Sequence, residues 1–161
     1  MKVVRTLWAM VAVTLAMGAG CNDTTSPEDI TDLEDITIQD LAGTWVASSF
    51  VYTGVDNPTQ QVDLIASGGS FTMTITAAGA FIGTTVYEPM GTLTFTGTMV
   101  VSNRTLIQDF ADEDIPTLTW TISDFEGDSL TMGGAQGPFD FTDNEIDDLV
   151  TASIQATVTR Q

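Results

Sequence analysis

The feature that most constrains this chain is a repeated alternation of apolar residues with threonine or serine. It runs through residues 71–76 and returns in residues 92–101, 117–123 and 153–159. A side-chain period of two puts one kind of side chain on each face of a β-strand. Strands with one apolar and one polar face are typical of antiparallel sheets that cover a core on one side only. The chain is therefore predicted to be all-β.

Turn signals divide the alternating stretches into short strands. Turns are expected at Gly68-Gly69, Ala78-Gly79, Pro89-Met90-Gly91, Ser102-Asn103, Gly127-Asp128, Gly133-Gly134 and Gly137-Pro138. The predicted strands are residues 43–53, 69–77, 80–87, 92–101, 104–109, 117–124, 128–133 and 149–160, and residues 138–142 are a candidate ninth. One short helix is predicted between the first two strands, with Asn57 as its cap, Pro58 in its first turn, and Val62, Leu64 and Ile65 facing inward.

A charged residue on an apolar strand face indicates how the sheet closes. Arg160 follows Val158 and Ala156 on the apolar side of the last predicted strand, so its charge needs a partner. Trp45 lies on the apolar side at the start of the first strand. In a closed up-and-down barrel these two strands are antiparallel neighbours, and the guanidinium then lies over the indole in a cation–π contact. The predicted fold is an eight-stranded antiparallel up-and-down β-barrel, or a nine-stranded one if residues 138–142 pair.

The same residues resemble the lipocalin and calycin group. That group carries Gly-x-Trp on its first strand and an Arg at the end of its last barrel strand, and the matching residues here are Gly43, Trp45 and Arg160. Asp40-Leu41 suit the short helical turn that closes the base of the barrel in that family. The resemblance implies a lipocalin-like domain over residues 40–161 that binds a small hydrophobic ligand and is not an enzyme. The chain departs from the group in having no Cys pair that ties its end to the barrel.

The apolar face of the predicted barrel supplies the candidate ligand contacts. An eight-stranded barrel either fills its interior with side chains or holds one small ligand. Small residues on inward positions leave room for a ligand, and methionine adapts to flexible guests. The candidate ligand-lining residues are Phe71, Met73, Ile75, Phe95, Met99 and Trp120, and the wider inward set adds Trp45, Leu93, Leu106, Leu118, Ile122, Leu130, Met132 and Ile154. A filled core is the alternative that the sequence leaves open.

Residues 1–20 have the three parts of an export signal. Lys2 and Arg5 give a positive start, and the apolar run over residues 7–17 is too short to span a bilayer as a helix. Small residues occupy positions 18–20. The sequence therefore predicts a signal peptide and export from the cytoplasm.

Cys21 is the single cysteine of the chain, and it directly follows the predicted signal peptide. A cysteine at this point resembles the lipobox of bacterial lipoproteins, although Gly18 stands where that family usually has Leu. The resemblance implies a lipid on Cys21, a flexible acidic tether over residues 21–39, and anchoring in the bacterial cell envelope. Asn22 after the cysteine favours the outer membrane. The alternative is ordinary secretion with Cys21 as a free thiol.

The charge and the absence of histidine exclude several classes of function. The chain has 22 acidic and 4 basic residues, a net charge of −18 at pH 7. So acidic a surface repels nucleic acids, and no nucleic acid partner is predicted. Without histidine, a Ser-His-Asp triad is impossible and the commonest metal ligand is missing. No phosphate loop or dinucleotide motif is present, so no cofactor is predicted. An enzyme working through loop carboxylates is the remaining catalytic alternative.

Two acidic loops carry the second hypothesis, which is a solid barrel that acts as an interaction or structural module. Carboxylate and amide oxygens in these loops could bind Ca²⁺ or face a protein partner, although neither loop has the EF-hand spacing, and no metal ligands are assigned. The first loop offers Asp109, Asp112, Glu113 and Asp114, and the second offers Asp140, Asp143, Asn144, Glu145, Asp147 and Asp148.

Overall fold

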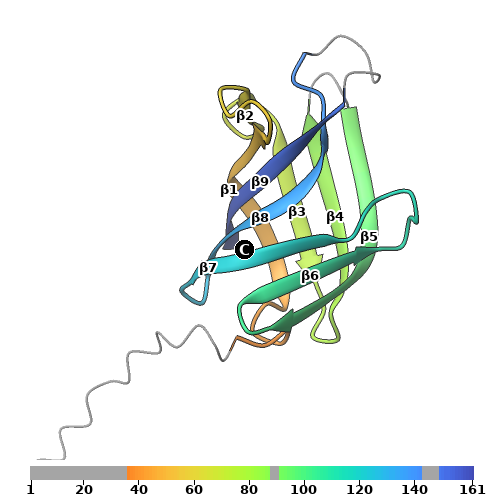
Figure 1. Ribbon diagram of the computed structural model, residues 1–161. Helices are drawn as coiled ribbons and strands as arrows, with labels where there is room; N and C mark the ends of the chain where they lie inside the picture. Colours follow the sequence, from red (N-terminus) through yellow and green to blue (C-terminus); the bar gives the residue numbers. More distant parts are fainter. Residues whose placement is uncertain (1–35, 88–90, 143–148) are drawn as a thin grey trace, which may run out of the picture. The chain divides into compact units, whose positions relative to one another are not determined.

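Nine β-strands run through the residues that the computed structural model describes, which are 36–87, 91–142 and 149–161 (Figure 1). None of these residues is helical. The strands are β1 (Gly43–Gly54), β2 (Gln61–Asp63), β3 (Ser70–Ile75), β4 (Ala80–Tyr87), β5 (Gly91–Ser102), β6 (Thr105–Phe110), β7 (Leu118–Phe125), β8 (Ser129–Phe139) and β9 (Val150–Arg160). Across these ranges, no helix has the length and hydropathy needed to cross a membrane.

Pairing between β1 and β9 closes the sheet. From β3 to β9 each strand pairs with the next along the chain, and β1 pairs with β3 on one edge and with β9 on the other. All of these pairings are antiparallel, and the β1–β9 register runs from Trp45 opposite Arg160 to Gly54 opposite Ala152. Eight strands thus form a closed wall, in which the first and last barrel strands pair with each other and are not left as two open edges. The predicted antiparallel up-and-down barrel is confirmed.

The ninth strand, β2, lies where the sequence predicted a helix. β1 pairs with β3 only over Gly43–Val46, so the same edge of β1 needs another partner farther along. β2 supplies it by pairing with residues 51–53. The predicted helix that begins after Asn57-Pro58 is therefore wrong, because satisfying the exposed backbone groups of β1 outweighs local helix signals in so short a segment. Leu64, predicted to face inward, is buried in the turn that follows β2.

β8 is longer than predicted because two glycine signals lie inside it. The turns predicted at Gly133-Gly134 and Gly137-Pro138 are wrong. The candidate ninth strand at residues 138–142 is wrong too, because residues 138–139 are the end of β8 and residues 140–142 are not in a strand. The β8–β9 register shifts between Gly133 and Ala135, and Gly134 has a φ of 85°. Gly134 is the extra residue of a β-bulge, a position that favours glycine because it requires a positive φ. The remaining barrel strands agree with prediction to within two residues.

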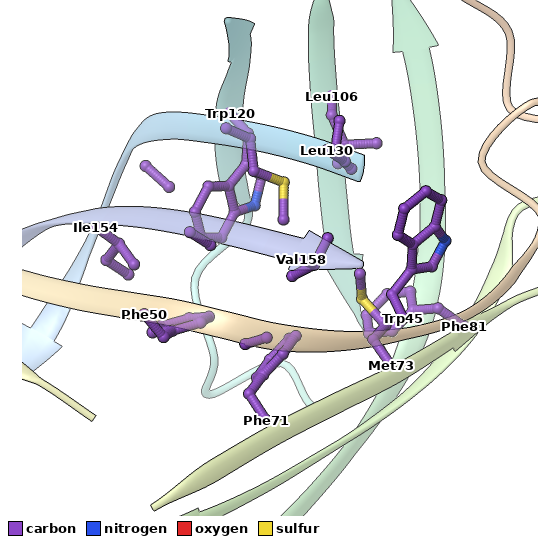
Figure 2. Close-up of a cluster of buried hydrophobic side chains, with 14 of the residues drawn as sticks. Trp45, Phe50, Phe71, Met73, Phe81, Leu106, Trp120, Leu130, Ile154 and Val158 are labelled. Carbon is purple, nitrogen blue, oxygen red and sulfur yellow. The ribbon is translucent and has the colours of Figure 1, made fainter. Parts of the chain in front are cut away.

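Large apolar side chains fill the interior of the barrel, and Figure 2 shows part of this core. The end of the barrel at which β1 begins is filled completely, and we call it the closed end. Side chains from several strands meet there with almost no exposure to solvent, so water is excluded from this part of the interior. The closed end comprises Trp45, Met73, Ile75, Phe81, Met99, Leu106, Ile122, Leu130, Met132, Ala156 and Val158.

Candidate functional site

The opposite end of the barrel contains an apolar cavity of about 280 Å³. The last residues of β1, β4, β6 and β8 and the first residues of β3, β5 and β7 meet there, because neighbouring antiparallel strands point in opposite directions. Its size lies just below the usual range for small-molecule sites, which are concave and mostly apolar. It is lined by Phe50, Tyr52, Leu64, Phe71, Thr85, Tyr87, Gly91, Leu93, Phe95, Gln108, Phe110, Asp114, Ile115, Pro116, Leu118, Trp120, Gly137, Pro138, Phe139 and Ile154.

Aromatic rings form much of the cavity wall and hold one another in place. Tyr52 stacks on Phe139 with ring centroids 4.0 Å apart and an angle of 16° between the rings. Phe50 lies 4.8 Å from Phe71, and Phe95 meets Phe110 edge to face at 5.7 Å. Such pairs are worth about 0.5–1.5 kcal/mol each beyond the area that they bury. The wall is therefore largely preorganised.

Three of the six predicted ligand-lining residues line this cavity: Phe71, Phe95 and Trp120. The other three, Met73, Ile75 and Met99, are buried at the closed end and do not line it. A period of two in the sequence distinguishes the inward face of a strand from the outward face. It does not give the height of a residue along the barrel axis, which follows from the register of all the strands.

Sequence reasoning missed Phe50, Tyr52 and Phe139 because β-bulges change which face is inward. The register of β1 against β9 shifts between Ala47 and Ser49, so inward positions move from odd to even numbers along β1. The bulge at Gly134 does the reverse in β8 and turns Phe139 toward the core. A bulge inserts one unpaired residue, and every later side chain then changes face.

Gly83 gives the Phe95 ring its place in the wall. The two residues are direct partners on β4 and β5. A Cβ atom on Gly83 would lie only 2.1 Å from Cε2 of Phe95, so the ring lies against the backbone of β4. Phe95 is also edge to face with Phe81, at 6.2 Å between centroids. The pairing of β5 with β6 begins only at Gly97, so the first part of β5, which contains Phe95, has no strand partner on that side within the described residues. This part of β5 borders the cavity.

Hydroxyl groups, one amide and one exposed carboxylate accompany the aromatic lining. Gln108 is only 4% exposed, and its Oε1 accepts a hydrogen bond of 3.0 Å from Trp120 Nε1. Burial raises the pKa of Tyr52 to about 12, so its hydroxyl is protonated at neutral pH. Asp114 is the single charged residue of the lining, and it is exposed. The lining described here contains no nucleophile paired with a base.

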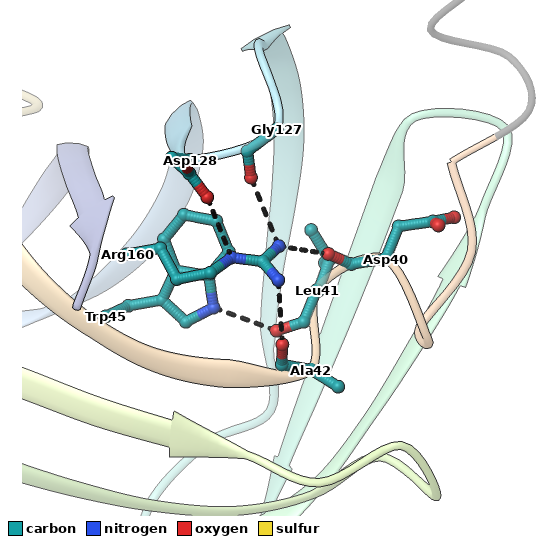
Figure 3. A network of polar contacts seen from close by, with 7 residues as sticks. All are labelled: Asp40, Leu41, Ala42, Trp45, Gly127, Asp128 and Arg160. Carbon is teal, nitrogen blue, oxygen red and sulfur yellow. Dashed lines mark hydrogen bonds and ion pairs between the residues drawn. The ribbon is translucent and has the colours of Figure 1, made fainter.

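Figure 3 shows Trp45 and Arg160, two of the three residues predicted to close the barrel, which lie at the closed end and away from the cavity. The guanidinium carbon of Arg160 lies 4.7 Å from the centroid of the Trp45 ring. Arg160 Nη1 donates to the carbonyl oxygen of Ala42 at 3.1 Å, and Nη2 donates to the carbonyl oxygens of Asp40 and Gly127. Three segments are thus tied together by one side chain.

The start of β1 is shaped to receive Arg160. Gly43 has a φ of 143°, and a Cβ on it would lie 3.5 Å from Cδ of Arg160. Trp45 Nε1 donates to the carbonyl oxygen of Leu41 at 2.8 Å. Asp40-Leu41 lie in two overlapping turns that replace the helical turn implied by the family resemblance. Asp40 has its pKa lowered by hydrogen bonds from the hydroxyl and backbone N–H of Thr37.

The acidic loops are only partly described. No group of three or more Asp, Glu or Cys side chains in residues 36–87, 91–142 and 149–161 is arranged to hold a metal ion. In the first loop, Asp109 accepts a hydrogen bond from Thr117 and Asp112 accepts one from the backbone of Asp114. Most of the second loop, residues 143–148, lies outside the described residues, as do the signal peptide, Cys21 and the tether up to residue 35.

Comparisons with known proteins give a likeness of fold. No family model matches the sequence, and a search of curated proteins finds no match. Among solved structures, the chain is similar to the crystal structure of a lipocalin-like protein from Bacteroides uniformis, with 15% sequence identity and a TM-score of 0.44. The likeness covers 76% of this chain and 99% of that one. The barrel assignment itself rests on the strand order and on the pairing of β1 with β9.

Proposed function

We propose that this protein is a lipid-anchored, lipocalin-like barrel of the bacterial cell envelope that binds or carries a small apolar molecule. The observation that carries the proposal is the cavity of about 280 Å³ with its aromatic lining. Burying apolar surface contributes about 25 cal/mol per Å² removed from water, and a preformed wall lowers the entropic cost of binding.

The residues of the cavity support the binding of a ligand and not its chemical conversion. Acid–base or nucleophilic chemistry needs two reactive groups within hydrogen-bond reach of each other. The polar groups of the lining are the hydroxyls of Tyr52, Thr85 and Tyr87, the amide of Gln108 and the exposed carboxylate of Asp114. These groups can orient a ligand, which supports a carrier or scavenger role.

The sequence supports the anchoring part of the proposal. Lys2, Arg5, the apolar run and Cys21 have the order of a lipoprotein signal, and residues 22–39 would separate the lipid from the barrel. Expression in a bacterial host with labelled palmitate tests it. The full chain should incorporate label and sediment with membranes, whereas Cys21→Ser should lose both properties. A Cys21→Ser protein that still sediments with membranes would contradict the lipid anchor.

Titration with Nile red, a neutral fluorescent apolar dye, tests the cavity. Phe95→Asp places a charge in the lining and should weaken binding at least about tenfold, because the charge must be desolvated or must hold water in the cavity. The matched control is Thr94→Asp, which adds the same charge to an exposed position on the same strand. Saturable binding that is unchanged by Phe95→Asp would place the dye elsewhere and remove the support for a cavity ligand.

A further inference from the structure

Gln108 is an anomaly in the cavity wall. It occupies an inward position on β6 between the apolar residues Leu106 and Phe110, and it is only 4% exposed. It is also the single polar or charged residue among the buried side chains of the described chain. Burying an amide costs about 1–3 kcal/mol unless its hydrogen bonds are made. An apolar side chain would fill this place at lower cost, so the amide calls for an explanation.

Trp120 determines which way the Gln108 amide faces. The indole Nε1 is a hydrogen-bond donor only, and it lies 3.0 Å from the Gln108 side chain. Oxygen and not nitrogen must therefore face the indole, which removes the usual ambiguity in orienting an amide. The NH₂ group of Gln108 points away from Trp120, and its two donor hydrogens need other partners.

The Gln108 NH₂ group faces the open space of the cavity. No hydrogen bond from Nε2 is found to any residue in the described part of the chain. Within that part, Arg160 Nε is the single enclosed side-chain nitrogen or oxygen without a hydrogen-bond partner. The unpaired Nε2 of Gln108 is therefore not enclosed by protein atoms, and since Gln108 lines the cavity, the nitrogen is open to it.

The charges near the cavity disfavour an anionic ligand. The described residues contain two basic side chains, Arg104 and Arg160, and neither lines the cavity. Asp114 adds a negative charge to the lining, and the chain as a whole is strongly acidic. A ligand carboxylate placed beside Gln108 would lose its hydration without gaining a counter-charge, which is a large cost.

From these observations we infer that the cavity selects an uncharged apolar molecule with a hydrogen-bond acceptor, such as a ketone, ester or amide carbonyl, and that Gln108 donates to that acceptor. The inference rests on the proposed function, since it names the class of ligand for the same cavity. Trp120 is a positioning residue in this arrangement, because it orients the Gln108 amide through its indole N–H. Long-chain carboxylic acids in their ionised form are predicted to be poor ligands.

Three fluorescent probes with one ring system test the inference. They are a dimethylaminonaphthalene methyl ketone, the analogue with ethyl in place of acetyl, and the analogue with an ionised carboxylate. The full-length protein should bind the ketone about threefold to tenfold more tightly than the ethyl analogue, the effect of one net hydrogen bond, and the carboxylate most weakly. In Gln108→Met, affinity for the ketone should fall to that for the ethyl analogue, whose own affinity stays within about twofold.

The ketone adds a spectroscopic readout, because its emission shifts to the red when its carbonyl accepts a hydrogen bond. Bound emission should shift to the blue in Gln108→Met but not in Gln155→Met, which changes an exposed glutamine on β9. Equal wild-type affinities for the ketone and ethyl probes, or tightest binding of the carboxylate, would overturn the inference whether or not Gln108→Met folds. If the wild type binds none of the three probes, the proposed function itself fails.

Discussion

Trp45 and Arg160 are direct cross-strand partners at the point where the barrel closes, and the guanidinium carbon lies 4.7 Å from the indole centroid. The two residues are 115 positions apart in the printed sequence. Arg160 also donates to three backbone carbonyls from two separate segments and lies 3.6 Å from a carboxylate oxygen of Asp128. One side chain thus joins the first strand, the last strand and the turn between β7 and β8.

Removing this side chain should destabilise the barrel. We expect Arg160→Ala to lower the free energy of unfolding by about 1–2 kcal/mol, since it removes the cation–π contact and leaves carbonyl groups without donors. Arg160→Lys should restore only part of the loss, because an ammonium group cannot stack on the ring or reach all three carbonyls. Thermal and urea unfolding measure both. An unchanged melting temperature in Arg160→Ala would contradict a role in closure.

A second prediction concerns Gly43, which has a φ of 143° beneath the Arg160 side chain. Gly43→Ala should cost about 1 kcal/mol, because an L-residue is strained at that backbone angle. The matched control is Gly133→Ala, where φ is ordinary and an added Cβ would have no neighbour closer than 3.7 Å. That control should be neutral or slightly stabilising. Equal effects of the two substitutions in urea unfolding would mean that the angle at Gly43 carries no strain.

Gly83 and Gly97 allow binding and stability to be separated. Alanine at position 83 meets the ring of Phe95 at 2.1 Å, and the ring can move into the cavity. Gly83→Ala should therefore weaken Nile red binding while costing less than about 1 kcal/mol of stability. Alanine at position 97 meets the backbone oxygen of Asp109 at 1.9 Å, which cannot move without breaking strand pairing. Gly97→Ala should cost about 1–3 kcal/mol. The reverse ranking in unfolding experiments would refute this account of the wall.

Asp63 should make part of the stability depend on pH. Burial raises its pKa, but hydrogen bonds from the backbone of residues 50, 65 and 66 and from the Ser49 hydroxyl lower it by more, so the net pKa is below the usual value. A lowered folded-state pKa contributes stability above the unfolded-state pKa, and this contribution disappears as the pH falls through the folded-state value.

Asp63→Asn should accordingly be less stable than the wild type at neutral pH, with a difference that narrows in acid. Melting temperatures measured from about pH 7 down to about pH 2 test this, because wild-type Asp63 loses its charge as the pH falls through its folded-state pKa, whereas the asparagine of the variant carries no charge at any pH. Asp56→Asn, in the exposed loop after β1, is the control. A gap between wild type and Asp63→Asn that stays constant over the whole range would show that the charge on Asp63 is not responsible.

The sequence alone was sufficient to predict the strands, whose signals are local, and the closure of the barrel between its first and last strands. Alternation in period two identified the strands, and the charge of Arg160 on an apolar face indicated that the last strand lies beside Trp45, as it does. The helix predicted over residues 57–65 failed because its competitor was not local. The free edge of β1 needed a partner, and only the assembled sheet reveals that need.

The cavity was decided by the tertiary structure. Bulges near Ala47 and at Gly134 change the inward face partway along β1 and β8, and the sequence has no strong local signal for the first of them. The pairing of Gln108 with Trp120 depends on the register between β6 and β7. Period and parity are properties of one strand. The height of a side chain in the barrel, and hence whether it fills the core or faces a ligand, depends on how all the strands are aligned.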